Sequence, residues 1–199
     1  MHSDKGKIMP WSLYNLEKII QCGADEHLSK DAFVKKYVSY DFLYGRGVPK
    51  SVSPEDGFRT LQSFLSLSYG DPRGVLVFPI PSNAVLYDLI QGAFKDRVGI
   101  GRNLQDSNVQ IVVPERSVSK LHAYIKRISG GLAIVDVSRF GTSVNGRKIT
   151  PNPPGMILSQ GDKIQFGMAN LIFEYLLAPA CYDAALQDID KFKHEKGNT

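Results

Sequence analysis

The sequence predicts a mainly β protein, an antiparallel β-sandwich preceded by a small helical module and followed by a C-terminal helix. Two changes of pattern indicate this. Apolar residues recur at helical spacing up to about residue 68, and from Gly74 they alternate in short runs separated by turn residues. Helical spacing returns beyond Pro179. We therefore expect a helical module over residues 1–73, a sandwich over residues 74–177, and a helix with a short tail over residues 178–199.

Three helices are predicted in the first segment. The first covers residues 10–20, whose apolar side chains recur at spacings of two to four. Ser29 is a candidate N-cap for a second helix, which we expect to run to Gly45. Ser53, followed by a proline and two acidic residues, is a typical start for a third helix that runs to Leu65. No catalytic or ligand-binding motif stands out here, so a packing role is favoured.

Short runs with strand character fill the second segment. The candidate strands are residues 75–78, 98–101, 109–113, 122–128, 132–137, 142–145, 147–149, 163–166 and 171–176. Gly130 and Gly131 join two of them, and Asn145 with Gly146 is a strong signal for a hairpin turn. The stretch from Ser82 to Arg97 is ambiguous between helix and strand.

Composition excludes several classes of protein. Hydrophobic residues make up 43% of the 199 residues and charged residues 22%, so the chain should fold around a core. The only two cysteines, Cys22 and Cys181, exclude a disulfide framework and a zinc site of cysteines. No apolar run approaches the ~20 residues of a membrane helix, and the polar first ten residues lack the apolar h-region of a signal peptide. We expect a soluble, cytoplasmic protein without metal or cofactor.

Positive charge concentrates in the predicted sandwich. The whole chain has a formal net charge of +4, and residues 97–177 hold ten Lys or Arg against five Asp or Glu. If the protein binds an anionic group, this half should bind it. The basic residues are scattered, however, and do not form the spaced strip that a nucleic-acid backbone would require, so binding to nucleic acid is disfavoured.

Four motifs follow one another in this half of the chain. They are Val-Gly-Ile-Gly-Arg at 98–102, Val-Ser-Lys-Leu-His-Ala at 118–123, Asp-Val-Ser-Arg-Phe-Gly-Thr-Ser-Val-Asn-Gly at 136–146, and Gly-Asp-Lys-Ile-Gln-Phe-Gly at 161–167. In order and spacing they resemble the forkhead-associated (FHA) domain family, over roughly residues 75–177. The resemblance implies a sandwich of about eleven antiparallel strands whose loops at one end bind phosphothreonine peptides.

The residues in these motifs fit that chemistry. Phosphothreonine carries a charge of about −1.5 to −2 and three acceptor oxygens, so its receptor needs a fork of donors and a hydroxyl. The candidate phosphopeptide-binding residues are Arg102, Ser119, Lys120, Ser138, Arg139 and Phe140. The resemblance implies that Arg102 and Ser119 contact the phosphate, and that Lys120 and Arg139 face the phosphate or the peptide.

A second set of residues is expected to support the binding loops. These are Gly101, His122, Gly141, Thr142, Asn145 and Gly146. The resemblance implies that His122 braces the loops by hydrogen bonds. One position departs from the family, because many members have Thr-Asn-Gly-Thr where this chain has Arg-Phe-Gly-Thr at 139–142. Phe140 thus replaces an asparagine that would bind the peptide backbone, and we expect Arg139 to compensate with a cationic contact.

These observations favour a non-enzymatic adaptor. It would capture threonine-phosphorylated proteins in Ser/Thr kinase signalling, with a Ser/Thr kinase as a further partner and no membrane contact. The alternative is a scaffold that uses the FHA fold or the helical module for contacts independent of phosphorylation, including homodimer contacts; the oligomeric state is left open. Ser119, His122 and Asp136 have the composition of a catalytic triad, but no Gly-x-Ser-x-Gly elbow exists. Thr60 and Thr199 are the plausible internal ligands for a self-recognition switch.

Overall fold

Two β-sheets and three helices make up the described part of the chain. The computed structural model describes residues 8, 11–20, 28–47, 75–82, 97–103, 105–129, 131–149, 155–169 and 171–197. The helices are α1 (Leu13–Ile20), α2 (Lys30–Lys36) and α5 (Ala178–Gly197). The strands are β1 (Trp11–Ser12), β2 (Tyr40–Arg46), β3 (Val75–Pro81), β4 (Arg97–Gly101), β5 (Ile111–Val112), β6 (Ala123–Ile128), β7 (Gly131–Asp136), β8 (Thr142–Val144), β9 (Arg147–Lys148), β10 (Met156–Ile157), β11 (Lys163–Phe166) and β12 (Ile172–Leu177).

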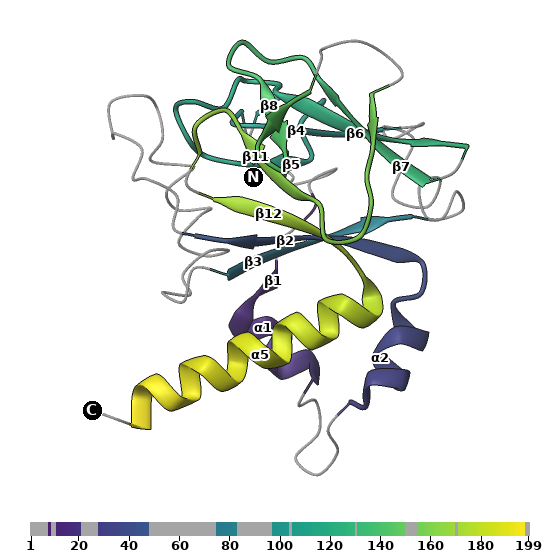
Figure 1. Cartoon of the computed structure of the whole chain (residues 1–199), viewed down its shortest axis with the longest axis vertical. Coiled ribbons are helices and arrows are strands. Elements are labelled where there is room, and N and C mark those ends of the chain that lie inside the picture. The colour runs from purple at the N-terminus through teal and green to yellow at the C-terminus, as the bar shows by residue number, and fades with distance from the viewer. Residues whose placement is uncertain are drawn as a thin grey trace.

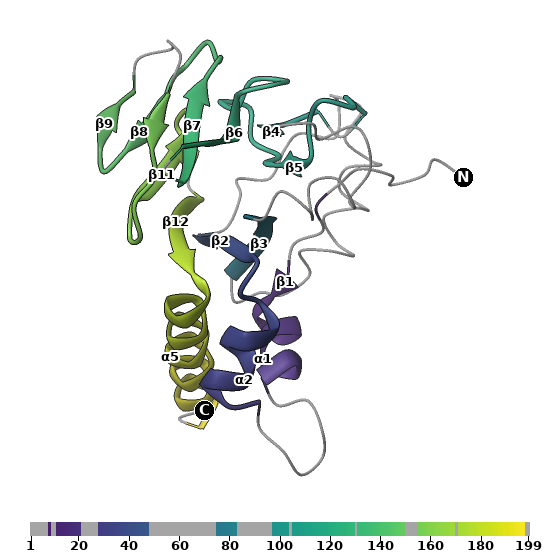
Figure 2. The same ribbon diagram turned by 90° about the vertical axis from the view of Figure 1, so that its right-hand side faces the viewer.

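The strands form a sandwich with helices on one outer face. A seven-stranded sheet has the order β1-β3-β2-β12-β11-β8-β9, and a five-stranded sheet has the order β10-β7-β6-β4-β5. Figure 1 shows the five-stranded sheet on one side of β2, β3 and β12 and the helices on the other side. The same three layers are visible from the side in Figure 2. The mainly β fold with a C-terminal helix, as predicted, is confirmed.

Two separate hydrophobic clusters lie on opposite faces of the seven-stranded sheet. In β2, Leu43 belongs to the cluster between the sheets, whereas Phe42 and Tyr44 belong to the cluster beneath the helices. In β3, Phe78 belongs to the cluster between the sheets and Val77 to the cluster beneath the helices. Successive side chains of a strand point to opposite faces, so a strand that is covered on both faces is apolar at every position.

The predicted hairpin at Asn145 and Gly146 is present. The φ angles of these residues are +52° and +77°, and Val144 pairs with Arg147 across the turn. A two-residue turn with positive φ at both central positions is type I′, which matches the right-handed twist of the flanking strands. This turn fixes the register of β9 against β8.

The second helix begins as predicted, whereas the first begins at Leu13 because Trp11 and Ser12 form β1. The Ser29 side chain accepts a hydrogen bond from the backbone N–H of Ala32 at 3.2 Å, which caps α2. The second helix, however, ends near Tyr37, and the expectation that it reaches Gly45 is wrong. Residues 40–46 form β2, which is paired on both edges by β3 and β12. Its consecutive apolar residues Phe42, Leu43 and Tyr44 fit a doubly covered strand as well as a helix, and local periodicity cannot separate the two.

Several predicted segments differ in detail or lie outside the described residues. The short strands β1 and β10 were not predicted, and β5 pairs with β4 in parallel, unlike the otherwise antiparallel ladders. The expected helix at 53–65 and most of the ambiguous stretch 82–97 fall outside the described residues. The proposed domain boundaries stay a prediction. Within the described residues, no helix is long and apolar enough to span a membrane.

Candidate functional site

Three loops that carry the predicted binding residues are held together by backbone hydrogen bonds. Arg102 follows β4 directly, and its N–H donates to the carbonyl of Ser119 at 3.0 Å. Ser119 lies between β5 and β6, and its hydroxyl oxygen accepts a hydrogen bond from the N–H of Arg139 at 3.1 Å. Arg139 lies between β7 and β8. The structure therefore brings Arg102, Ser119 and Arg139 together from three separate parts of the sequence.

His122 links the same loops through its imidazole ring. Its Nδ1 accepts from the N–H of Ser119 at 2.9 Å, so Nε2 carries the proton and donates to the carbonyl of Gly141 at 3.1 Å. The side chain is fully buried, and this burial lowers its pKa, although the Gly141 carbonyl and Asp136 oppose the shift. A neutral ring is the form that can accept at one nitrogen and donate at the other.

The loop between β7 and β8 is shaped by one buried carboxylate. Oδ1 of Asp136 accepts from the hydroxyl of Ser138 at 2.7 Å and from that of Thr142 at 2.9 Å. The Ser138 hydroxyl oxygen in turn accepts from the N–H of Gly141 at 2.7 Å. Gly141 has a φ of +86°, a conformation that favours glycine. The loop is therefore held at both ends by hydrogen bonds of its own.

Gly101 allows the first two loops to approach each other closely. A Cβ atom at this position would lie 2.1 Å from the carbonyl oxygen of Lys120, which is too close for any side chain. Lys120 itself is exposed, and its carbonyl accepts from the N–H of Asn103 at 3.3 Å. Glycine at 101 is thus a steric requirement for the contact between these loops.

Asn145 and Gly146 form the β8–β9 turn, and Asn145 joins this turn to the segment before β11. The Asn145 side chain donates to Asp162 at 2.8 Å and accepts from the N–H of Lys163 at 2.9 Å. The Asn145 backbone N–H also donates to the carbonyl of Lys163 at 2.8 Å. These bonds anchor the hairpin to the segment that leads into β11.

The side chains that remain available are cationic or aromatic. Arg102 is half-buried, and its Nε is buried without a hydrogen-bond partner in the described structure. Arg139 is exposed and lies with its guanidinium 5.7 Å from the ring centre of Phe140, which is itself 43% exposed. A buried donor without an acceptor is costly, so an anion that accepts from Arg102 would remove this cost.

The catalytic arrangement of Ser119, His122 and Asp136 is not formed. Ser119 bonds to His122 through its backbone N–H, while its hydroxyl oxygen accepts from Arg139. Nε2 of His122 lies 3.9 Å from Oδ1 of Asp136, beyond hydrogen-bonding distance. A general base must reach the proton of the nucleophile, and here the ring accepts the N–H instead of the hydroxyl.

Sequence reasoning missed two features of the site. Asp136 was considered only as a triad member, although Ser138 and Thr142 at short spacing after it could have signalled an acceptor for their hydroxyls. The loop after β11 was also missed. The N–H of Gly167 donates to the carbonyl of Gly141 at 2.9 Å, and this contact joins segments too far apart in sequence to be predicted by pattern.

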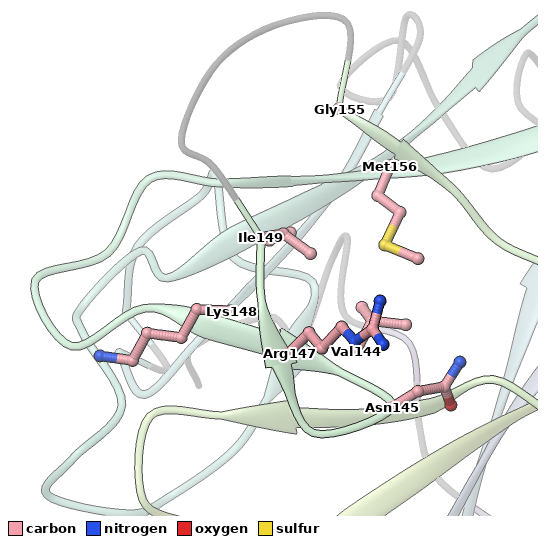
Figure 3. A pocket seen from close by; sticks show the side chains of 7 residues that line it. All are labelled: Val144, Asn145, Arg147, Lys148, Ile149, Gly155 and Met156. Atoms are coloured by element: carbon pink, nitrogen blue, oxygen red, sulfur yellow. The ribbon is translucent and has the colours of Figure 1, made fainter.

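A pocket lies between β9 and β10, the edge strands of the two sheets. It has a volume of about 550 Å³ and is lined by Val144, Asn145, Arg147, Lys148, Ile149, Gly155 and Met156. Figure 3 shows Arg147, Val144 and Met156 together, whereas the ammonium group of Lys148 points away from them. Among the described residues, no group of three His, Cys, Asp or Glu side chains could hold a metal ion.

The fold and these loops define a β-sandwich module with a hydrogen-bonded loop cluster that presents cations. The family model of the FHA domain matches residues 98–167, which contain all four predicted motifs. The predicted resemblance to the FHA domain family is therefore confirmed over these residues. No relative of this chain was found among the curated proteins.

Solved structures of FHA domains are similar to this chain. The N-terminal FHA domain of Saccharomyces cerevisiae Rad53p, in complex with a phosphothreonine peptide, is 21% identical with a TM-score of 0.40, and the match covers 54% of this chain and 89% of that one. The FHA domain of the Chlamydia trachomatis CT664 protein is 18% identical with a TM-score of 0.42, covering 69% and 97%. An Arabidopsis thaliana FHA domain is 17% identical with a TM-score of 0.44, covering 70% and 87%.

Proposed function

We propose that this chain is a phosphothreonine-dependent adaptor that binds phosphorylated proteins without catalysing a reaction. The observation that carries the proposal is the convergence of Arg102, Ser119 and Arg139 at one hydrogen-bonded loop cluster. The match of residues 98–167 to the FHA domain supports it, because resemblance to this family implies binding of phosphothreonine peptides. A phosphorylated Ser/Thr kinase substrate is the expected partner.

Each group has a defined part in phosphate capture. Arg102 supplies a guanidinium whose Nε lacks a partner in the described structure, and charge-assisted bonds of this kind contribute about 1.5–3 kcal/mol each. The Ser119 hydroxyl oxygen accepts from Arg139, which leaves its proton free to donate to a phosphate oxygen. Lys120 and Arg139 add exposed positive charge beside it.

The remaining predicted residues divide into peptide contact and support. Phe140, 43% exposed, offers an apolar surface where many family members have asparagine. Ser138 was expected to contact the peptide, but its hydroxyl bonds to Asp136 and Gly141, so we assign it to loop support instead. His122 holds the loops of Ser119 and Gly141 in register, as expected for a bracing residue.

The proposal is tested with matched peptides. A phosphothreonine peptide array should identify the peptides that bind. Isothermal titration of these peptides should give a micromolar Kd, a binding free energy on the order of −8 kcal/mol, and their unphosphorylated twins should not bind. Equal affinity for both forms would instead support the phosphorylation-independent scaffold. A second arm compares Arg102→Ala, expected to abolish binding, with Arg97→Ala as a control.

The control residue, Arg97, has the same charge as Arg102 and lies at the opposite end of β4. Arg97 opens β4, and Arg102 follows its last residue. The Arg97 guanidinium lies 5.2 Å from the ring centre of Tyr124, outside the loop cluster. Unchanged binding by Arg102→Ala, with a normal thermal unfolding curve, would contradict the proposed role of this guanidinium.

A further inference from the structure

The hairpin after the β7–β8 loop carries a lysine that the four motifs do not include. The Lys148 side chain crosses Gly141 closely. A Cβ atom built on Gly141 would lie 3.4 Å from Cδ, 3.5 Å from Cε and 3.7 Å from Nζ of Lys148. Gly141 ends the loop that contains Arg139 and Phe140. An ammonium group therefore lies at the rim of the proposed peptide site, although it comes from a different strand.

The backbone position of Lys148 is fixed by the strands that carry it. Lys148 pairs with Ser143 in the β8–β9 ladder, and the N–H of Ile149 donates to the carbonyl of Thr142 at 2.9 Å. The type I′ turn at Asn145 sets this register and is anchored to the segment entering β11. Because β8 continues directly from Gly141, Lys148 keeps a constant relation to the loop.

The charge of Lys148 is not neutralised within the described structure. Its side chain is exposed, and no described carboxylate pairs with it. Asp136, the last residue of β7, and Asp162, which precedes β11, accept hydrogen bonds from hydroxyl, amide and backbone groups. An unpaired ammonium beside a peptide site favours an acidic group on the peptide.

On its other side, Gly141 is flanked by apolar surface. Its carbonyl accepts from the N–H of Gly167, and the next residue, Met168, is 72% exposed. Phe140, which precedes Gly141, is 43% exposed. A peptide that crosses Gly141 thus meets this apolar surface and the Lys148 ammonium, a cation separate from Arg139, whose guanidinium lies beside the Phe140 ring. This contrast between apolar surface and positive charge lets Lys148 distinguish an acidic side chain from a neutral one.

We propose that Lys148 selects phosphothreonine peptides that carry an acidic side chain, Asp or Glu, in the part of the peptide that crosses Gly141. This inference rests on the proposed function and adds a specificity residue to it. The Lys148 ammonium pairs with the peptide carboxylate. The pair is exposed, so its contribution to affinity is modest, about two- to fivefold.

Arg147 provides the matched control. It has the same charge, is also exposed and precedes Lys148 in β9. It pairs with Val144, whose buried side chain belongs to the core between the sheets, so the two basic residues point to opposite faces of the strand. Figure 3 shows the Lys148 ammonium directed away from the Arg147 side of the hairpin.

The test uses phosphothreonine peptides in which one flanking position at a time is Glu or Gln. Wild-type protein should bind the Glu peptide about two- to fivefold more tightly at one position, and the ratio should fall as salt screens the pair. Lys148→Gln should bring this ratio to one, and Arg147→Gln should keep it. Lys148→Glu should reverse the preference toward a Lys peptide at that position.

The outcomes separate this inference from the proposed function. Three results would overturn the role of Lys148. The wild-type protein could show no preference for Glu at any position, the preference could survive Lys148→Gln, or Arg147→Gln could remove it equally. Phosphothreonine dependence and its loss in Arg102→Ala would then still stand. Thermal unfolding of both glutamine variants should match the wild type, since both side chains are exposed.

Discussion

The loop cluster and the helix-covered face of the seven-stranded sheet are stabilised by different forces. Beneath α1, α2 and α5, aromatic rings pack closely. The ring centre of Phe33 lies 4.7 Å from that of Tyr37 and 5.4 Å from that of Tyr182. In the loop cluster, hydrogen bonds that involve Ser119, His122 and Asp136 hold the loops instead. The comparison indicates that one region supplies stability and the other holds binding groups in position.

The helix-covered face also contains polar groups, but these are satisfied internally. The Tyr44 hydroxyl donates to Asp188 at 2.8 Å, and Arg46 pairs with Asp188 at 3.0 Å and with Glu174 at 3.1 Å. The thiol of Cys181 is buried, and this burial raises its pKa, so it packs as an apolar group. By contrast, the loop cluster leaves Arg102 Nε unpaired within the described structure.

The largest effect on stability is expected from Phe33→Ala. Phe33 is fully buried, and its removal leaves a cavity among the rings that unite α2, α5 and β2. The free energy of unfolding should fall by about 3–5 kcal/mol in urea titrations. The Kd for a phosphothreonine peptide, measured where the variant is still folded, should not change. A large change in Kd would show that the two regions are coupled.

Gly101→Ala should act mainly on the loop cluster. The added methyl group would lie 2.1 Å from the Lys120 carbonyl oxygen, so the segment before β6 must move. We expect a loss of about 1–3 kcal/mol in stability together with weaker peptide binding.

Gly161→Ala is the control for this experiment. Gly161, unlike Gly101, has a positive φ, +89°, and a Cβ there meets no atom within 4 Å. This variant should lose stability through backbone strain and keep its peptide affinity. If both variants bind peptide like the wild type, close approach at Gly101 does not position the binding groups.

The bracing histidine predicts a pH dependence of stability. Burial lowers the pKa of His122 below its ordinary value of 6.5, so the unfolded chain binds more protons than the folded chain as pH falls through this range. The stability contribution is complete above pH 6.5 and is lost on acidification, by at most about 1.4 kcal/mol per pH unit for one proton.

This dependence is measured as the unfolding free energy between pH 8 and pH 5. His122→Asn removes the titrating group, so the variant is expected to be less stable at pH 8 but to have a shallower slope than the wild type. Equal slopes would show that His122 does not contribute to acid sensitivity.

The smallest effect is expected from Lys30→Ala on the surface of the helical layer. Lys30 pairs with Asp183 at 2.6 Å, but the two side chains are 45% and 50% exposed. Solvent screening limits such pairs, so stability should fall by about 0.5 kcal/mol or less in urea titrations. A loss above that of Phe33→Ala would contradict the view that ring packing holds the helices on the sheet.

Local signals in the sequence were sufficient for much of the fold. The N-cap at Ser29, the turn at Asn145 and Gly146, and the strands around His122 depend on residues within a few positions of one another. The short strand β10 was missed because two residues carry no measurable period. The error at residues 40–45 arose because a run that is apolar on both faces has neither a helical nor an alternating pattern.

For the candidate site, the motifs predicted which residue types are present, but not which partner each side chain contacts. Ser138 and Arg139 are neighbours in sequence. One bonds inward to Asp136, and the other extends outward over Phe140. That Lys148 crosses Gly141 follows from strand register, which no motif records.

The sequence by itself determined most strands of the second half, the hairpin turn, the helix cap and the FHA motifs, because these depend on side chains close together along the chain. Only the tertiary structure decided that residues 40–46 join the sheet between β3 and β12, that His122 connects Ser119 with Gly141, and that Lys148 lies beside the binding loop. The strand assignment depends on a partner more than 100 residues away in sequence, since Leu43 pairs with Tyr175. The bridge made by His122 and the place of Lys148 depend on how loops and strands pack in space, which neighbouring residues do not encode.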